Sequence, residues 1–507
     1  MYIGRRTSLT SHIAFFDYVK KIRNYGEGLS VIFWDMRTGA PKKGLSQRAE
    51  VIGTLSAELF ALQSSDELGK LLDEVEQDLA NVDFVTKRLY EEVKKGYDEL
   101  KKIPADQYKE FMVLKSNAEF AWEEAKDKAD FSLFLPHLKT IIAYQKKFTQ
   151  YWGIKNGSAY NTLLDKYEPG MTTDILDHVF GELKETIVPL IKAINGSLNK
   201  PNTDILFNHF PKVGQHAVSL ELLKQLGYDF EAGRLDETNH PFMIGLNPGD
   251  IRITTKYEEN DFRSAIFGTI HECGHAIYEQ NINPELNGLP LSTCSSTGIH
   301  ESQALFYENF IGRNESFWKC NFELLQKHSP KQFNNITVEE FLKMINVVEP
   351  SLIRIEADEL TYPLHIMVRY EIERELFDGE LQVEDLPKVW NDKYEEYLGI
   401  RPANDAEGVL QDIHWSDGSF GYFPSYALGF IYAAQWKAAM DKDIPNFDEL
   451  CAEGNITPIR EWLTEKVHKH GALKKPFELL QEGTGEGLNA SYLAKHLKEK
   501  YTKLYNL

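Results

Sequence analysis

The chain has 507 residues, a formal net charge of −21 and four cysteines. The negative charge repels phosphate backbones and anionic bilayers, so neither nucleic acid nor a membrane is an expected partner. Four dispersed cysteines do not make a disulfide framework, and no apolar run reaches the length of about 18 residues that a membrane span needs. Asp17 interrupts the apolar run Ile13–Phe16, so no signal peptide is expected and a cytoplasmic location is predicted.

Amphipathic helices are predicted from residue 8 to about residue 150, with a break at Trp34–Pro41. A loop-like connector is expected over residues 160–170, because it ends in Pro-Gly. Helices then resume to about residue 230. No repeat, low-complexity segment or flexible linker divides the chain, so residues 1–507 are predicted to form a single unit.

The pattern changes at Asp250–Thr255, where polar and β-branched residues alternate and predict a β-strand. A strand in this place, just before the motif described next, can bind an extended peptide along its edge. Helices dominate again afterwards. They are predicted over residues 299–312, 337–349, 351–378, 384–397, 425–441, 458–470 and 488–505.

The central motif is His271-Glu272-Cys273-Gly274-His275, an H-E-x-x-H pattern. On a helix, two histidines four residues apart lie on one face and can bind one metal ion. Glu272 lies beside them and can act as general base on a water activated by the metal. The flanking residues favour a helix, since Ile266, Ile270 and Ile277 repeat at helical spacing. The alternative is that both are ordinary core histidines.

A catalytic metal of this type needs a third protein ligand, and Glu301 is the candidate. It opens a second apolar-faced helix after a Gly- and Ser-rich loop that can return the chain to the metal. The alternative is a first-turn glutamate favoured by the helix dipole. Asn281 stands where a metzincin has its third histidine, which excludes that class. Leu305 stands four residues after Glu301, so a thermolysin-like supporting carboxylate is not expected.

Two further clusters can carry chemistry. Arg354 lies in a predicted apolar helix, where it can grip a carboxylate with two hydrogen bonds or pair with Asp358 one turn later. The loop of residues 408–426 concentrates polar and aromatic residues, among them His414, and a tyrosine or histidine there can donate to an oxyanion. The alternative for this loop is a buried polar turn.

Taken together, these residues resemble the carboxypeptidase Taq family of zinc-dependent carboxypeptidases. The family's motifs occur in order, as H-P-F at 240–242, D-x-R-x-T at 250–254, H-E-x-x-H at 271–275, H-E-S-Q at 300–303, I-R-x-x-A-D at 353–358 and G-x-x-Q-D-x-H-W at 408–415. The resemblance implies a mainly helical fold, similar to that of neurolysin and angiotensin-converting enzyme, with a long substrate groove and a small sheet beside the active site. It also implies a homodimer. Within each chain, N-terminal helices over about residues 1–150 are expected to line or cover the groove, and the catalytic core is expected over about residues 230–440.

The resemblance further implies removal of C-terminal residues from peptides with broad specificity, proline being disfavoured. Arg354 becomes the first candidate to hold the substrate carboxylate and Arg252 the second. His414 and Tyr426 become candidate oxyanion donors, with Tyr422 as the rival. The remaining candidate substrate contacts are His240, Asp250, Gln303 and Gln411.

The predicted cofactor is one zinc ion per chain, held by His271, His275 and Glu301, although cobalt can share such a site. Two alternatives stay open. The first is an oligopeptidase that cuts inside short peptides and needs no grip on a carboxylate. The second is a catalytically silent helical metal-binding or scaffold protein, against which the intact Glu272 argues.

Overall fold

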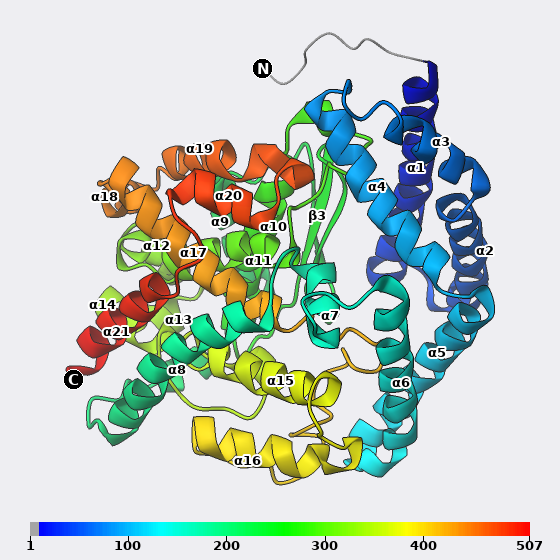
Figure 1. Cartoon of the computed structure of the whole chain (residues 1–507). Helices are drawn as coiled ribbons and strands as arrows, with labels where there is room; N and C mark the ends of the chain where they lie inside the picture. Colours follow the sequence, from blue (N-terminus) through cyan, green and yellow to red (C-terminus); the bar gives the residue numbers. More distant parts are fainter. Residues whose placement is uncertain (1–9) are drawn as a thin grey trace.

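The computed structural model describes residues 10–507 as a mainly helical protein with one small sheet, which confirms the predicted fold class (Figure 1). The helices that precede the sheet are α1 (Thr10–Thr38), α2 (Leu45–Gln63), α3 (Asp66–Glu76), α4 (Phe84–Lys102), α5 (Ala105–Lys128), α6 (Leu135–Trp152), α7 (Ala159–Tyr167), α8 (Thr173–Gly196) and α9 (Lys212–Leu226). Residues 8 and 9, where the predicted N-terminal helical region begins, lie outside the described residues.

The helices that follow the sheet carry most of the motifs. They are α10 (Arg263–Gln280), α11 (Thr297–Leu305), α12 (Glu315–His328), α13 (Pro330–Phe333), α14 (Val338–Ile345), α15 (Tyr362–Phe377), α16 (Leu386–Leu398), α17 (Pro424–Asp443), α18 (Phe447–Ala452), α19 (Thr457–Lys466), α20 (Pro476–Thr484) and α21 (Ser491–Tyr505). Directly after α11 the chain continues as a π-helix over Phe306–Ile311. Buried apolar side chains from Phe15 to Tyr505 form one continuous cluster beneath these elements.

The sheet has three strands, β1 (Leu235–Glu237), β2 (Met243–Asn247) and β3 (Asp250–Thr255), in the order β1-β3-β2. The predicted strand at residues 250–255 is therefore confirmed. It pairs parallel to β1 and antiparallel to β2. The expectation that a peptide adds to the edge of this strand is wrong, because β1 and β2 already occupy both of its edges.

The sheet lies between α1 and the motif helix α10, as Figure 1 shows. On one side β3 packs against α10. On the other, Arg23 of α1 donates to the carbonyl of Leu246 on β2 at 3.1 Å, and Trp34 meets the ring of Phe242 at 5.6 Å. Because Trp34 is buried in this contact, α1 continues through the predicted break and ends only at Thr38.

Two other expectations about local structure are wrong. The connector expected over residues 160–170 is helix α7, which Ser158 caps and whose Leu163 and Leu164 are buried. The helix expected over residues 351–378 begins only at Tyr362. Asp358 accepts hydrogen bonds from the backbone of Leu360 and Thr361, a turn that a helix does not contain, and only a short 3-10 turn precedes it.

Among residues 10–507, none of the helices is long and apolar enough to cross a bilayer.

Candidate metal centre

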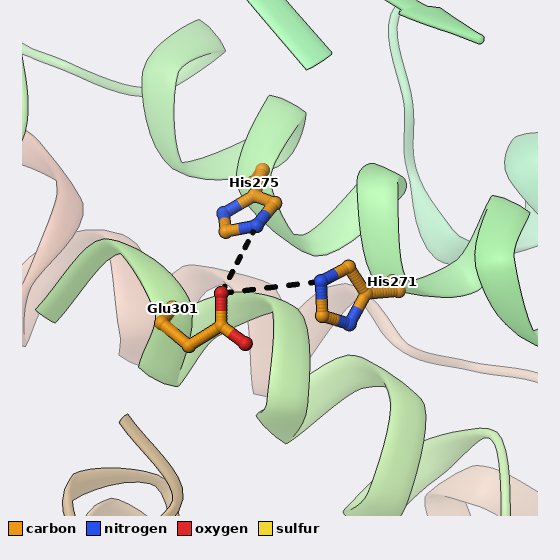
Figure 2. A group of neighbouring side chains, drawn as sticks. All are labelled: His271, His275 and Glu301. Atoms are coloured by element: carbon orange, nitrogen blue, oxygen red, sulfur yellow. Dashed lines mark ion pairs between the residues drawn. The ribbon is translucent and has the colours of Figure 1, made fainter. Parts of the chain in front are cut away.

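Helices α10 and α11 bring three potential metal ligands together (Figure 2). His271 and His275 lie one turn apart on the same face of α10, and Glu301 reaches them from α11. The Oε2 atom of Glu301 lies 3.5 Å from Nε2 of His275 and 4.0 Å from Nε2 of His271. One donor atom from each residue lies within 4.8 Å of the other two. Sequence reasoning paired these residues across a loop, and the structure brings them together.

This donor set fits a zinc-type ion. In a tetrahedral site with metal–ligand distances of about 2.0–2.1 Å, neighbouring ligand atoms lie roughly 3.3 Å apart. The separations of 3.5 and 4.0 Å from Glu301 to the histidines need only a small contraction to reach that geometry. Two imidazoles and one carboxylate are the ligands of many catalytic zinc sites, and they leave a fourth position open.

Glycines allow the helices that carry the ligands to approach one another closely. A Cβ atom on Gly274, inside the motif, would lie 2.4 Å from the carbonyl oxygen of Gln303 and 2.7 Å from Cα of Ala304. A Cβ on Gly429 of α17 would lie 2.6 Å from Cγ of Glu301. Since real Cβ atoms do not approach so closely, α11 can lie between α10 and α17 only with glycine at both contacts.

The N-terminus of α11 is held by a carboxylate that sequence reasoning missed. Ser296 caps the helix by accepting from the amide of Ile299, and Glu168 accepts from the amide of Gly298 at 3.0 Å. Tyr432 of α17 donates to the same carboxylate at 2.8 Å. Burial raises the pKa of Glu168 to about 7, although these donors oppose the rise. This buried carboxylate links α11 to α17 close to the position of Glu301.

His271 also has a carboxylate partner, although it does not stand at the thermolysin-like position four residues after Glu301, which Leu305 occupies. Its Nδ1 lies 3.0 Å from Oε2 of Glu308, which stands in the π-helix seven residues after Glu301. Arg313 donates to the other oxygen of Glu308 at 3.1 Å. Burial disfavours this carboxylate, but His271 and Arg313 hold its pKa below the ordinary value. A seven-residue step returns to the same helix face, and that spacing was the available signal.

Glu272 lies beside the ligands and is 9 % exposed. Burial raises its pKa to about 7, and the charge of Glu301 adds to the rise while His271 opposes it. A carboxylate with a pKa near neutrality can both accept and return a proton at physiological pH. The geometry therefore suits the role of general base that the motif predicts for it.

Arg354 lies in a 3-10 turn and is largely buried. The alternative of an ion pair with Asp358 is wrong, because that carboxylate binds the backbone of its own turn. Arg354 instead donates through Nε to Asp412 at 3.0 Å and through a terminal nitrogen to the hydroxyl of Tyr362 at 3.2 Å. Its guanidinium lies 4.8 Å from the ring centre of Tyr426.

His414, Tyr422 and Tyr426 form one aromatic cluster. Nε2 of His414 lies 3.2 Å from the hydroxyl of Tyr426, and the two tyrosine rings are 5.3 Å apart. Burial lowers the pKa of His414 to about 4, which leaves a neutral imidazole at pH 7. Burial also raises the pKa of both phenols, and the charge of Glu301 contributes to each rise. Both phenols therefore lie within electrostatic reach of the metal centre.

Three predicted substrate contacts lie around the sheet. Arg252 on β3 makes two hydrogen bonds to Asp250, at 2.6 and 2.7 Å, and its guanidinium lies 5.6 Å from the ring centre of Trp34. A cavity of about 530 Å³ opens beside Arg252, and its lining does not include a metal ligand. His240 is exposed in the loop between β1 and β2.

The two glutamines that the motifs suggested as substrate contacts serve the protein itself. Gln303 is fully buried and pairs with Nε2 of His468 at 2.8 Å. Gln411 donates to two backbone carbonyls, and its oxygen accepts from Arg354 and Arg369. These four bonds fill the capacity of the amide. Both amides are thus engaged by the protein, and direct contact of either glutamine with substrate stays a prediction.

Comparisons with known proteins agree with this geometry. A family model described as carboxypeptidase Taq (M32) metallopeptidase matches residues 14–501. Carboxypeptidase 1 of Bacillus subtilis is 55 % identical over 493 residues, which cover 97 % of this chain and 98 % of that protein. Thermostable carboxypeptidase 1 of Thermus thermophilus is 40 % identical over 485 residues, covering 93 % and 94 %. The crystal structure of the M32 carboxypeptidase from Deinococcus radiodurans superposes with a TM-score of 0.95 at 33 % identity, covering 98 % of this chain and 100 % of that one.

Proposed function

The chain belongs to the carboxypeptidase Taq (M32) family of metallopeptidases, so it is a metal-dependent carboxypeptidase, and we propose that its metal is zinc. One observation carries this proposal: donor atoms of His271, His275 and Glu301 lie within 4.8 Å of one another, with Glu272 beside them. One ion per chain is expected, and cobalt can replace zinc in such a site. The chain acts as a single catalytic unit.

When bound, the metal supplies a Lewis acid that polarises the scissile carbonyl and lowers the pKa of water. Glu272 takes the proton of the attacking water and later delivers it to the leaving amine. Its pKa of about 7, raised by burial, suits both transfers. Glu308 fixes the ring of His271 through Nδ1, so that Nε2 points toward Glu301.

The negative oxygen of the tetrahedral intermediate is stabilised by His414, Tyr426 or Tyr422. Two observations support this role. The three side chains contact one another, and the negative charge of Glu301 contributes to the raised pKa of both phenols. One such donor contributes about 3–4 kcal/mol to the transition state. The neutral state of His414 at pH 7 allows it to donate from one ring nitrogen and accept at the other.

The substrate's terminal carboxylate is held by Arg354. Asp412 fixes the guanidinium, and the ring of Tyr426 lies against it, so the arginine is oriented beside the oxyanion donors. Arg252 is the second candidate; Asp250 accepts its hydrogen bonds, and His240 stands in the loop that precedes β2. Broad specificity that disfavours proline, a homodimeric state and a cytoplasmic location complete the proposal; these three follow from the family resemblance and from the sequence.

The test starts from chelated protein. Zinc or cobalt is added back, and the release of the C-terminal residue from a short peptide is compared with release from its C-terminally amidated form. Activity that returns with zinc and strongly prefers the free acid supports the proposal. Equal rates on both peptides would indicate an oligopeptidase, and metal binding without peptide cleavage would indicate a silent metal-binding protein.

A further inference from the structure

A buried carboxylate outside the metal centre holds the loop that carries His414 and Tyr422. Glu373 lies on α15 and is fully buried. One of its oxygens accepts from the indole nitrogen of Trp415 at 2.7 Å. The other accepts from the amide of Gly421 at 2.9 Å and from the hydroxyl of Tyr160 on α7 at 2.7 Å.

Two of these three bonds are placed next to proposed oxyanion donors. Trp415 directly follows His414, and Gly421 directly precedes Tyr422. A single side chain thus anchors the loop at both ends of the segment that separates the two donors. In Figure 1, α7 lies next to α15, so the third bond ties this anchor to the N-terminal half of the chain.

The anchored loop has little freedom to relax. Gly421 has a φ of +84°, and a Cβ there would lie 2.8 Å from the carbonyl carbon of Leu163 and 2.9 Å from the amide nitrogen of Leu164. The loop backbone is therefore pressed against α7 at the point where Glu373 holds it. The other end is confined too, since the ring of Trp415 stacks on Phe420 with centroids 6.1 Å apart.

Burying a carboxylate in the protein core costs free energy. Burial raises the pKa of Glu373 to about 7, and the donors from Gly421, Trp415 and Tyr160 oppose that rise. Packing alone therefore does not explain a glutamate here; the donors from Tyr160, Trp415 and Gly421, which need an acceptor, do. The carboxylate also fixes the orientation of the loop, because its two oxygens determine where each N–H and O–H donor must point.

We propose that Glu373 is a positioning residue that sets the separation and orientation of His414 and Tyr422 by holding the residues adjacent to both. The inference rests on the proposed function, in which these two side chains stabilise the oxyanion. The hydrogen bonds of Glu373 go to Tyr160, Trp415 and Gly421, so it acts through the loop.

The test is the Glu373→Gln variant in the full chain with its metal. A glutamine side chain presents one carbonyl acceptor and one NH2 group with two donors, so either Trp415 or Gly421 would face an N–H group instead of an acceptor. A displacement of about 1 Å in a catalytic group costs on the order of a hundredfold, so we expect kcat to fall by about that factor. The KM and the metal content should stay within about twofold, because neither binding site is altered.

Tyr160→Phe is the matched control. It removes a hydrogen bond of the same 2.7 Å length to the same carboxylate, but one that comes from α7 and not from the loop. We expect it to lower the Tm while kcat stays unchanged. If Glu373→Gln lowers only the Tm and leaves kcat unchanged, the role is merely structural and the inference is overturned. If Glu373→Gln does not fold, Trp415→Phe replaces it as the test, because it removes one hydrogen bond between the loop and Glu373. A lowered kcat supports the inference, and a lowered Tm with unchanged kcat overturns it.

Separate substitutions distinguish failure of this inference from failure of the proposed function. If His414→Ala and Tyr422→Phe both leave kcat unchanged, the assigned oxyanion donors are wrong and the inference falls with them. If they lower kcat but Glu373→Gln does not, only the inference fails. If all three substitutions lower kcat, Glu373→Gln should lower kcat by a smaller factor in the double variant His414→Ala, Tyr422→Phe than in the parent protein. If the factor is the same in both backgrounds, the effects are additive, and Glu373 does not act through the loop.

Discussion

Gly429 of α17 lies directly against the side chain of Glu301 on α11. A Cβ on this glycine would come within 2.6 Å of Cγ and 2.7 Å of Cβ of Glu301. These are atoms at the base of the glutamate, which cannot swing aside as the tip of a flexible side chain can. The position of Glu301, the proposed third metal ligand, is therefore coupled to the absence of a side chain on a helix more than 120 residues later in the sequence.

Gly429→Ala should weaken metal binding, because α17 and α11 must separate and carry Glu301 away from the histidines. Overpacking costs about 1–3 kcal/mol, which would raise the Kd for zinc by roughly five- to a hundredfold if this cost weakens the metal-bound state. The measurement is competition for zinc with a chromophoric chelator. Gly181→Ala on α8, where a Cβ meets nothing within 4 Å, should leave the Kd unchanged. Equal Kd values for Gly429→Ala and the parent would contradict the coupling.

Glu272→Gln should abolish turnover and leave the metal bound. The amide has nearly the same shape as the carboxylate but cannot accept the proton of the attacking water. General acid–base catalysis contributes about 10²–10⁴-fold, so kcat should fall by at least that order. Metal analysis of the purified variant checks that binding is intact. A variant with near-parental kcat would contradict the assignment of Glu272 as the general base.

Glu308→Gln should loosen the metal by removing the charge that orients His271. Loss of such a carboxylate–histidine contact typically costs about 10–100-fold in metal affinity or activity. Zinc affinity is compared with that of Glu315→Gln on α12, a half-exposed glutamate that pairs with Lys319 at 2.8 Å. Only Glu308→Gln should show a raised Kd. Identical behaviour of the two variants would mean that the 3.0 Å contact to His271 has no functional weight.

Arg354→Lys should erase the preference for a free C-terminus. Lysine keeps the charge but loses the planar fork that can bind a carboxylate while Asp412 holds the other edge. Breaking a buried, hydrogen-bonded charge contact costs about 2–5 kcal/mol, so kcat/KM on the free-acid peptide should fall by at least about thirtyfold. The readout is the ratio of rates on free and amidated peptides. Arg374→Lys, in an exposed pair with Asp177, should preserve that ratio.

The protein should lose stability in acid through Glu359. This carboxylate is buried and accepts from His496, Lys500 and Tyr501 of α21. Burial opposes its charge, but the attraction of Lys500 and His496 outweighs burial and holds its pKa well below the ordinary value. A lowered pKa in the folded state means that the stabilisation is present above the unfolded pKa of about 4.3 and is lost as the pH falls below it.

Comparison with Glu359→Gln makes this measurable. At pH 7 the substitution leaves Lys500 without its buried partner and should lower the free energy of unfolding by about 3–5 kcal/mol. Below about pH 4 the unfolded parental chain takes up a proton at Glu359, which the folded carboxylate resists because its pKa is lowered. This proton uptake favours the unfolded parental chain, so the difference between the two proteins should shrink. Denaturant unfolding at several pH values tests this, and a difference that does not depend on pH would contradict it.

Local chemistry allowed much of the site to be predicted. The spacing of His271 and His275 requires only a helix, and the apolar periodicity around them predicts that helix, which is α10. The alternation at residues 250–255 predicts β3 in the same way. Glu301 was a candidate because it opens the next apolar-faced helix after a Gly- and Ser-rich loop. It lies 26 residues beyond His275, however, and no local pattern could show how closely the two approach.

The contacts that support these residues were decided by tertiary structure. Asp412 pairs with Arg354 across 58 positions, and Glu373 reaches Trp415 across 42. Such pairings depend on how separate helices pack. For the same reason, the helical pair of Arg354 with Asp358 was a reasonable expectation and a wrong one.

The sequence by itself thus determined which residues can bind a metal and move a proton, because those capacities belong to side chains and to short spacings. Only the tertiary structure decided how close Glu301 comes to the histidines, which carboxylate orients His271, and which glycines leave room for α11. These are properties of packing, where one methyl group at Gly274 or Gly429 would displace a whole helix.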